Sequence, residues 1–359
     1  MKIGLIIPAN IKYSPYVQYY IQNFKKEEID YVTIVWNKKN INENADYIYD
    51  YPCKDTNRKK ILIGHYKFAK KCKEIIRKEN LDKLIIFTIA PAFFLGRHYL
   101  KKYRNNFILD IRDDSPFRRK FPNELKKICE IAFSVVVSSN NFAPWTGRDI
   151  ILCHNTDVKI IKKYFDVKIH KKTNKPLSIV FAGSMIEPDI NIKVLSKLQN
   201  NPNYKLGFIG HNNIGKEKII EYANKNNIHN VWFEGTFQKE EIVCKYQSCA
   251  DLINIFRRNT IVNKNALPNK MYDAIISAIP LIVFEHNEAI CRYVKEYNLG
   301  IILQEKDMCN LENIIIEKFE EFNYKKFGAG RILFLRKVLR DMSLFSDALS
   351  KFVKEERTL

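Results

Sequence analysis

Lys270 and Asp273 are the only charged side chains in an otherwise apolar stretch, "LPNKMYDAIISAIPLIV", at residues 267–283. Pro268 predicts that a helix begins here, because proline suits the first turn, where its missing N–H would have no partner. A helix start offers free N–H groups and a partial positive charge, to which Lys270 adds a full one. The helix start could serve as an anion site, with Asp273 placed to accept hydrogen bonds from paired hydroxyls. On these residues alone, a plain structural pair between the two side chains is the more common outcome.

The apolar positions of this helix recur at the spacing of a single buried stripe. The residues of the stripe are Met271, Ala274, Ile275 and Ala278. Lys270, Asp273 and Ser277 share the opposite face. We therefore expect Asp273 to face a cleft, with little influence on stability.

Small and charged residues also follow several strand-like runs in the second half of the chain. Gly183, Ser184 and Gly210 stand where glycine would let the backbone approach a phosphate. Arg257 and Arg258 directly follow another run, where one of them could offset diphosphate charge. Plain tight turns and surface arginines are the alternatives.

In the first half, the run "FILDIRDD" (107–114) ends in acids. Asp113 could act as a general base toward an acceptor hydroxyl. Alternatively, Asp113 and Asp114 could cap the next helix or form a turn with Ser115. The role of His154, near the middle of the chain, is left open, although a lone histidine is more often structural.

Composition limits the classes of protein that remain. None of the eight cysteines forms a CxxC pair, so neither a zinc site nor a disulfide framework is indicated, and the pattern is typical of reduced cytosolic thiols. The start of the chain lacks a signal-peptide cleavage pattern. The longest apolar run, residues 84–96, is too short to span a bilayer. We expect a soluble, cytoplasmic protein.

The formal charge of +20 favours anionic partners. The densest basic cluster, "FRRKFPNELKK" (117–127), is either a solvated helix face or a contact with an anionic membrane surface. Nucleic acid is disfavoured, because aromatic residues do not interleave with basic ones as a stacking platform requires.

The elements that must position these residues are short runs of Ile, Val, Leu and Phe without clean alternation, separated by helical spacers. Such runs are typical of parallel strands buried on both faces. The expected strands are 2–8, 31–36, 84–87, 107–112, 134–139, 150–154, 177–183, 205–210, 231–235, 252–256, 280–284 and 300–304. We predict an α/β protein with two Rossmann-like doubly wound domains facing a cleft.

The predicted domain boundaries follow from this rhythm. Residues 1–155 form the first domain, 156–176 a polar linker, and 177–325 the second domain. Residues 326–359 are rich in helix formers and are expected to form a helix that returns to the first domain.

Five segments in order resemble the GT-B glycosyltransferases, specifically the family 4-like group. "VWFEGTFQKEEIVCKYQSCADLINIF" (231–256) resembles that family's strand, glycine turn, helix and strand. "LPNKMYDAIISAIPLIV" resembles its acidic donor-binding element, with Asn265 at the usual first acid, Asp273 at the second and Ile279 where glycine is usual. The segments 89–114, 132–140 and 151–165 resemble elements of the acceptor domain and its end.

The resemblance implies that a nucleotide-diphosphate sugar is the co-substrate and that no metal ion or other cofactor is needed. Lys270 and Arg257 would stabilise the diphosphate, and Asp113 would be the base. The implied donor-binding residues are Gly183, Ser184, Gly210, Gly235, Thr236, Phe237, Asn265, Asn269 and Asp273.

The implied activity is transfer of a sugar, with its anomeric configuration retained, to a glycan or lipid-linked acceptor in bacterial surface polysaccharide synthesis. The implied location is the inner face of the plasma membrane, where the protein would be peripheral. Two alternatives stay open. One is a nucleotide-sugar epimerase of the same architecture. The other is a catalytically silent partner subunit, which the amide of Asn265 at an acid position favours.

Overall fold

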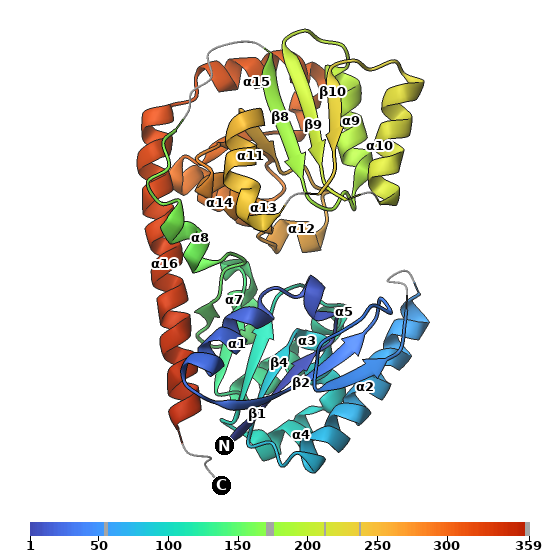
Figure 1. Ribbon diagram of the computed structural model, residues 1–359, viewed down its shortest axis with the longest axis vertical. Coiled ribbons are helices and arrows are strands. Elements are labelled where there is room, and N and C mark those ends of the chain that lie inside the picture. Colours follow the sequence, from blue (N-terminus) through green and yellow to red (C-terminus); the bar gives the residue numbers. More distant parts are fainter. Residues whose placement is uncertain (54–56, 170–175, 212, 237, 356–359) are drawn as a thin grey trace. The chain divides into compact units, whose positions relative to one another are not determined.

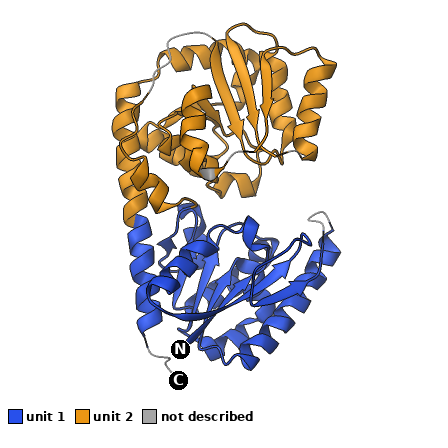
Figure 2. Ribbon diagram, viewed as in Figure 1, with its two compact units in different colours: residues 1–154, 341–359 blue, residues 155–340 orange. Residues whose placement is uncertain are grey.

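The protein, seen in a computed structural model, is described over residues 1–53, 57–169, 176–211, 213–236 and 238–355. The chain divides into two compact units (Figure 2). Unit 1 consists of residues 1–154 and 341–359, and unit 2 of residues 155–340. Each unit holds one parallel sheet with helices around it, so the predicted α/β architecture of two Rossmann-like domains is confirmed.

Unit 1 is built on a seven-stranded sheet of order β3-β2-β1-β4-β5-β6-β7 (Figure 1). Its strands are β1 Lys2–Ile7, β2 Asp30–Asn37, β3 Tyr47–Asp50, β4 Lys83–Phe87, β5 Phe107–Ile111, β6 Ser134–Val137 and β7 Ile151–Leu152. Its helices are α1 Val17–Lys26, α2 Arg58–Lys78, α3 Ile89–Leu95, α4 Arg97–Leu100, α5 Pro116–Lys120, α6 Pro122–Ile131 and α7 Ala143–Thr146. Short 3-10 turns are η1 Ile11–Tyr13, η2 Lys101–Tyr103 and η3 Asn140–Phe142.

Unit 2 is built on a six-stranded sheet of order β10-β9-β8-β11-β12-β13. Its strands are β8 Leu177–Ala182, β9 Tyr204–Ile209, β10 Val231–Glu234, β11 Leu252–Asn254, β12 Leu281–Phe284 and β13 Gly300–Leu303. Its helices are α8 Val158–Lys163, α9 Pro188–Leu198, α10 Ile214–Lys225, α11 Ile242–Cys249, α12 Ile261–Asn265, α13 Asn269–Ile276, α14 Glu288–Tyr297 and α15 Leu311–Glu320, with the 3-10 turns η4 Lys239–Glu241 and η5 Glu305–Asn310.

All twelve expected strands are present, and one strand was not predicted. The missed strand, β3, lies at the edge of the unit 1 sheet and alternates between half-buried and exposed residues. It has only four residues and follows a polar, asparagine-rich segment, so its sequence lacks the apolar run that marks the others.

The last helix, α16 (Tyr324–Lys354), is present as predicted and ends in unit 1. Within unit 1, the buried His154 Nε2 lies 3.0 Å from Asp341 Oδ2. Ser346 Oγ donates to Asn23 Oδ1 at 2.7 Å, and the ammonium of Lys83 donates to the carbonyl of Phe352. His154 therefore has a structural role, since it ties the end of unit 1's first segment to α16.

In unit 2, the guanidinium of Arg331 on α16 donates hydrogen bonds to backbone carbonyls at the ends of two other helices. Its Nε donates to Ile275 O at 2.7 Å and its Nη2 to Ile276 O at 2.8 Å, at the end of α13. The same guanidinium donates to Tyr164 O and Phe165 O, just after α8, at 2.9 and 2.8 Å. Only 2% of Arg331 is exposed, and its burial lowers the pKa of the guanidinium to about 10.

We expect Arg331→Lys to lower the stability of unit 2 by about 3 kcal/mol, because a lysine cannot reach four carbonyls and leaves buried acceptors without donors. Arg336→Lys, on the exposed side of the same helix, should change stability by less than about 0.5 kcal/mol. Thermal unfolding followed by circular dichroism measures both. Equal melting of the two variants would contradict the role given to Arg331.

Candidate functional site

The candidate site of unit 2 lies at the point where its strand order reverses. From β8 the chain proceeds to β9 and β10 on one side, and β11 then pairs with β8 on the other. Ligands of doubly wound sheets bind beyond the carboxyl ends of the strands at this switch point. The segments that follow β8 and β11 therefore carry the candidate residues, which include Gly183 and Arg257.

Two predicted glycines meet at this edge. Gly183 N donates to Ile209 O at 2.9 Å, and Gly210 N donates to Glu234 O at 3.1 Å, so the ends of three strands are linked. A Cβ added at Gly210 would lie 2.4 Å from Gly183 O, whereas one added at Gly183 would meet nothing within 4 Å. Gly183 itself needs glycine for another reason, because its φ is +117°.

The side chain of Lys216 hydrogen-bonds the backbone at this edge of the sheet. Only 3% of it is exposed, and its Nζ donates to Gly210 O at 2.9 Å and to Glu234 O at 2.7 Å. Burial lowers the pKa of this ammonium, and Glu234 opposes the shift. A buried lysine that bonds two strand-end carbonyls is a positioning group for the turn rather than a ligand contact.

Lys270 and Arg257 come close enough to repel each other. The Lys270 ammonium lies 3.3 Å from the centroid of the Phe181 ring, at the start of α13. Desolvation lowers the pKa of Lys270 well below its usual value, the Arg257 charge lowers it further, and Glu187 raises it. The predicted pair of cations is therefore brought together, with one carboxylate beside it. A multiply charged anion would relieve their repulsion.

Arg258, the other candidate arginine, is already engaged. Its Nε lies 2.9 and 2.8 Å from the two carboxylate oxygens of Asp189. Glu187 accepts from Arg258 N at 3.2 Å and from Asn263 Nδ2 at 2.8 Å. Of the two arginines that follow β11, Arg258 is thus paired with Asp189, whereas Arg257 acts electrostatically on Lys270.

The expectation that α13 has one polar, cleft-facing side is wrong. Residues 271–276 are all buried, Asp273 is only 8% exposed, and Ser277 is fully buried. The pKa of the buried Tyr246 on α11 is raised well above its usual value. Burial is the main cause, and the electrostatic effect of the Asp273 carboxylate is the second. A substitution of Asp273 is therefore expected to change the stability of unit 2, because removing a buried charge perturbs the groups around it.

The backbone position that favours glycine at the end of α13 is Ala278 (φ +56°), whereas the family resemblance placed the usual glycine at Ile279. Ile279 N donates to Ala274 O at 3.0 Å, which is the pattern of a helix-ending motif that favours glycine.

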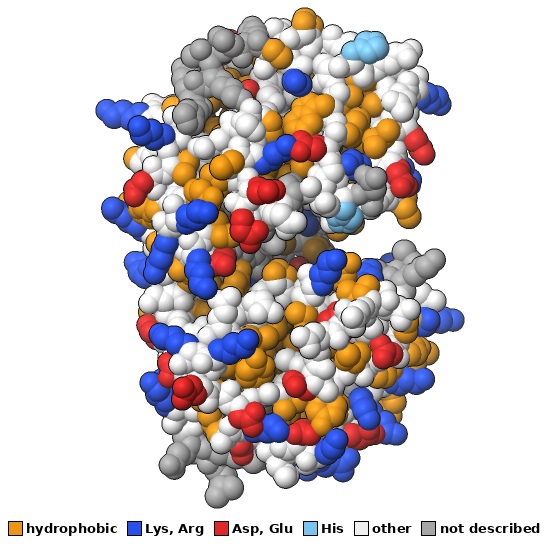
Figure 3. All heavy atoms as spheres, in the orientation of Figure 1, with side chains coloured by type: hydrophobic (Ala, Val, Ile, Leu, Met, Phe, Trp, Pro, Cys, Tyr) orange, Lys and Arg blue, Asp and Glu red, His pale blue; other side chains and the backbone are white. Residues whose placement is uncertain are grey.

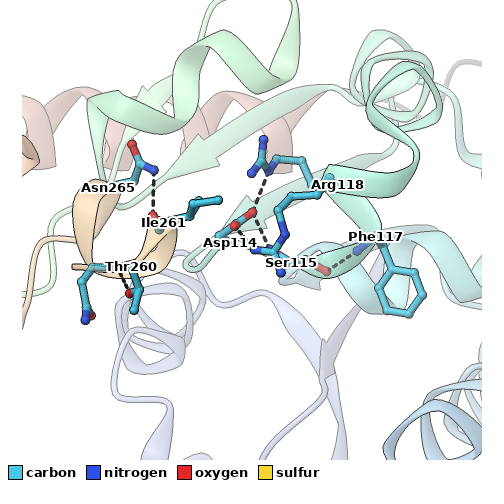
Figure 4. Close-up of polar contacts among 9 residues, drawn as sticks. Asp114, Ser115, Phe117, Arg118, Thr260, Ile261 and Asn265 are labelled. Carbon is cyan, nitrogen blue, oxygen red and sulfur yellow. Dashed lines mark hydrogen bonds and ion pairs between the residues drawn. The ribbon is translucent and has the colours of Figure 1, made fainter. Parts of the chain in front are cut away.

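The remaining donor-site predictions lie on separate segments of unit 2. Asn265 ends α12, and its Nδ2 donates to Ile261 O at 2.9 Å (Figure 4). Asn269 is exposed at the first position of α13. Gly235 and Thr236 are exposed just after β10, and Phe237 lies outside the described residues.

In unit 1, a buried ion pair holds the end of β5. Arg112 Nη2 donates to Asp110 Oδ2 at 2.6 Å, and Tyr20 OH donates to the same oxygen at 2.7 Å. Arg112 Nη1 also donates to Cys153 O at 2.9 Å. Burial raises the pKa of the Asp110 carboxyl against the opposing effect of Arg112. The pair fixes the segment that leads to Asp113.

Asp113 is exposed directly after this segment, whereas Asp114 is structural. The Asp114 carboxylate accepts from Ser115 N at 2.8 Å and from Arg118 Nε at 2.6 Å (Figure 4), and it also pairs with Arg119. The turn-forming alternative therefore applies to Asp114 and Ser115. Two cations of the basic cluster at 117–127, Arg118 and Arg119, pair with this one carboxylate, which offsets one of their two charges.

The described ranges contain no group of three or more His, Cys, Asp or Glu side chains placed to hold a metal ion. No helix within them has the length and apolar character needed to cross a membrane.

Comparison with known proteins gives structural matches alone. No protein-family model matches the sequence, and no curated protein matches it. Sucrose-phosphate synthase from Thermosynechococcus elongatus superposes with a TM-score of 0.69 at 12% identity, over 98% of this chain and 99% of that one. HepE from Anabaena, in complex with UDP and glucose, gives 0.62 at 12% identity, over 97% and 99%.

A third match is a protein from Listeria monocytogenes assigned as a UDP-N-acetylglucosamine 2-epimerase, with a TM-score of 0.58 at 12% identity, over 100% of this chain and 98% of that one. At these identities the likeness establishes the fold. The chain has the two-domain architecture of its GT-B glycosyltransferase neighbours.

Sequence reasoning missed several residues of the site. Asn263 is 3% exposed, and its Nδ2 donates to Glu187 and, at 2.9 Å, to Arg258 O. His286, just after β12, has its Nε2 2.7 Å from Arg257 O. The position of His286 beyond a strand end was a usable signal. Nothing in the sequence pattern distinguishes Asn263 from the other asparagines.

Gly210→Ala should weaken binding of a nucleoside diphosphate by on the order of tenfold, because its Cβ would push the Gly183 carbonyl out of place. Gly328→Ala, in α16, is the matched control, since a Cβ there meets only the end of the Ile169 side chain. Isothermal titration with UDP and GDP gives both affinities. An unchanged affinity in the Gly210 variant would mean that this turn does not touch the ligand.

The lowered pKa of Lys270 predicts a pH dependence. Only the protonated ammonium attracts an anion, so affinity for a nucleoside diphosphate should fall as pH rises through the free-state pKa, and above that pKa binding should take up a proton. The ligand's own phosphate ionises near about 6 and is fully charged at higher pH. Titrations above pH 7.5 in buffers of different ionisation enthalpy measure the uptake. Lys264→Met, which removes an exposed lysine paired with Glu288, should leave the profile intact; a flat profile in the unaltered protein would contradict the prediction.

Proposed function

We propose that this chain is a glycosyltransferase that uses a nucleotide-diphosphate sugar as donor. The observation that carries the proposal is the cation pair of Lys270 and Arg257 at the switch point of the unit 2 sheet. The glycine turn at Gly183 and Gly210 lies at the same sheet edge and leaves backbone room beside it. The structural neighbours, one of them bound to UDP and glucose, support the same class of ligand.

In this proposal, unit 2 binds the donor and the two cations stabilise the leaving diphosphate electrostatically. The start of α13, with Asn269, adds backbone N–H groups, and Ser184, Gly235, Thr236, Phe237, Asn265 and Asp273 stay donor-site proposals. No metal ion or other cofactor is required, since the charge of the leaving group is met by side chains. Retention of anomeric configuration is the expected outcome from the family resemblance.

Unit 1 would bind the acceptor, with Asp113 as the base. Its exposure after the rigid Asp110–Arg112 segment supports that assignment. The acceptor class proposed is a glycan or lipid-linked glycan of bacterial surface polysaccharide synthesis. A cytoplasmic protein that is peripheral on the inner membrane face would meet both the donor and such an acceptor.

Two other functions keep specific support. The epimerase-like neighbour shows that the same fold accompanies a different assigned activity, which would need no acceptor. Asn265, bound to its own helix, provides an amide where the resembled family has an acid, which favours a silent partner subunit. Turnover with and without acceptor separates the three.

Asp113→Asn should leave donor binding unchanged and reduce acceptor-dependent turnover by on the order of 100-fold, because an amide cannot take the acceptor proton. The assay is release of nucleoside diphosphate from a panel of nucleotide sugars, with and without lipid-linked glycan acceptors. Asp149→Asn, a substitution of another unit 1 aspartate outside the proposed site, is the control.

Acceptor-dependent release in the unaltered protein is the expected result. Isomerised sugar in the absence of acceptor would replace the transferase proposal with the epimerase. Donor binding without turnover on any acceptor would favour the silent subunit.

A further inference from the structure

Helix α2 of unit 1 carries an unusual concentration of positive charge. Its 21 residues include nine Lys or Arg side chains and one acid, Glu74. Elsewhere the excess charge is more dispersed, and Figure 3 shows basic side chains interspersed with acidic ones over the face drawn. Such a helix attracts an extended anionic partner rather than a single small anion.

The same helix exposes large apolar side chains between its cations. Leu62 is 50% exposed, Ile63 48% and Tyr66 65%. Lys59 precedes Leu62 by three residues, and Lys70 follows Tyr66 by four. The two lysines therefore lie on one stripe of the helix with the three apolar side chains. Neither lysine forms an ion pair with a described residue, and the same holds for Arg77 two turns further on.

Packing fixes this stripe outward. The opposite side of α2, including Phe68, Cys72 and Ile76, is buried in the unit 1 core. A Cβ added at Gly64 would lie 2.3 Å from the ring of the fully buried Trp36, so helix and ring are in close contact. Rotation of α2 about its axis is therefore blocked, and Leu62 and Ile63 cannot turn inward.

A neighbouring segment adds to the surface. The ring of His65 on α2 stacks on that of Phe94 on α3, with ring centroids 5.6 Å apart. The ring centroids of Phe93 on α3 and Phe121 lie 6.2 Å apart. Phe121, at the end of α5, is 53% exposed. Because Arg118 and Arg119 are paired with Asp114, the charge of this segment is weaker than that of α2.

We propose that the exposed stripe of α2, residues Lys59, Leu62, Ile63, Tyr66, Lys70 and Arg77, docks unit 1 on the surface of an anionic phospholipid bilayer. Cations beside exposed aliphatic and aromatic side chains match an interface whose outer layer is charged and whose inner layer is apolar. Lysine stems extend along the apolar layer while their ammonium groups stay at the headgroups. A nucleic acid matches the stripe less well, since Leu62 and Ile63 can neither stack on bases nor donate hydrogen bonds.

This surface is independent of the proposed transferase activity, and its test needs no substrate. The full chain is sedimented with vesicles of phosphatidylcholine, with and without phosphatidylglycerol. We expect binding that requires phosphatidylglycerol. Substitution of Lys59, Lys70 and Arg77 by Gln should weaken it about a hundredfold, since each such charge contributes about fivefold. Substitution of Leu62 and Ile63 by Ser should weaken it about tenfold through lost apolar burial.

The matched control removes the same charge from unit 2 by substituting Lys197, Lys218 and Lys225, all exposed, by Gln. That variant should bind vesicles within a few-fold of the unaltered protein. Circular dichroism melting checks that each variant folds. If the Leu62 and Ile63 variant does not fold, the result for the charge variant alone tests the proposal. Equal losses in the two lysine variants, or no loss in either α2 variant, would overturn the proposal. So would binding to single-stranded DNA but not to vesicles.

Discussion

The guanidinium of Arg331, buried beneath four backbone carbonyl oxygens, is the contact on which the arrangement of unit 2 depends. Two of these carbonyls end α13, and the other two follow α8. A cation at the carboxyl end of α13 also complements the dipole of that helix. The other end of the same helix carries Lys270. A single residue of α16 thus sets where the amino end of α13, and its ammonium, stand relative to the sheet.

The elements of the fold follow from the sequence because parallel strands buried on both faces need continuous apolar runs. Twelve such runs became strands, and the edge strand β3, without such a run, escaped prediction. The order of the strands also brings the segments after β8 and β11 together, as a doubly wound sheet requires. The meeting of Gly183 with Gly210 could be anticipated from strand ends alone, whereas the joint placement of Lys270 and Arg257 was expected from the family resemblance.

The burial of Asp273 could not be anticipated, because it depends on residues remote in the chain. The periodicity of α13 marks one apolar stripe, yet Tyr246 of α11 and Phe334 of α16 cover other sides of the helix. The pairing of charges was hidden for the same reason. Arg258 and Arg118 each read as a basic residue in a run, whereas Asp189 and Asp114 neutralise them.

Glu187 gives the unit 2 site a property that cations alone would lack. Its carboxylate is held by Asn263 and by the backbone of Arg258, and it acts electrostatically on Lys270. The resting site therefore already contains one fixed negative charge beside its two cations, and that charge offsets part of their attraction for anions. A monovalent ion such as chloride can offset only one of the cations. A ligand with two or more negative charges can offset both, so the site discriminates among anions by their valence.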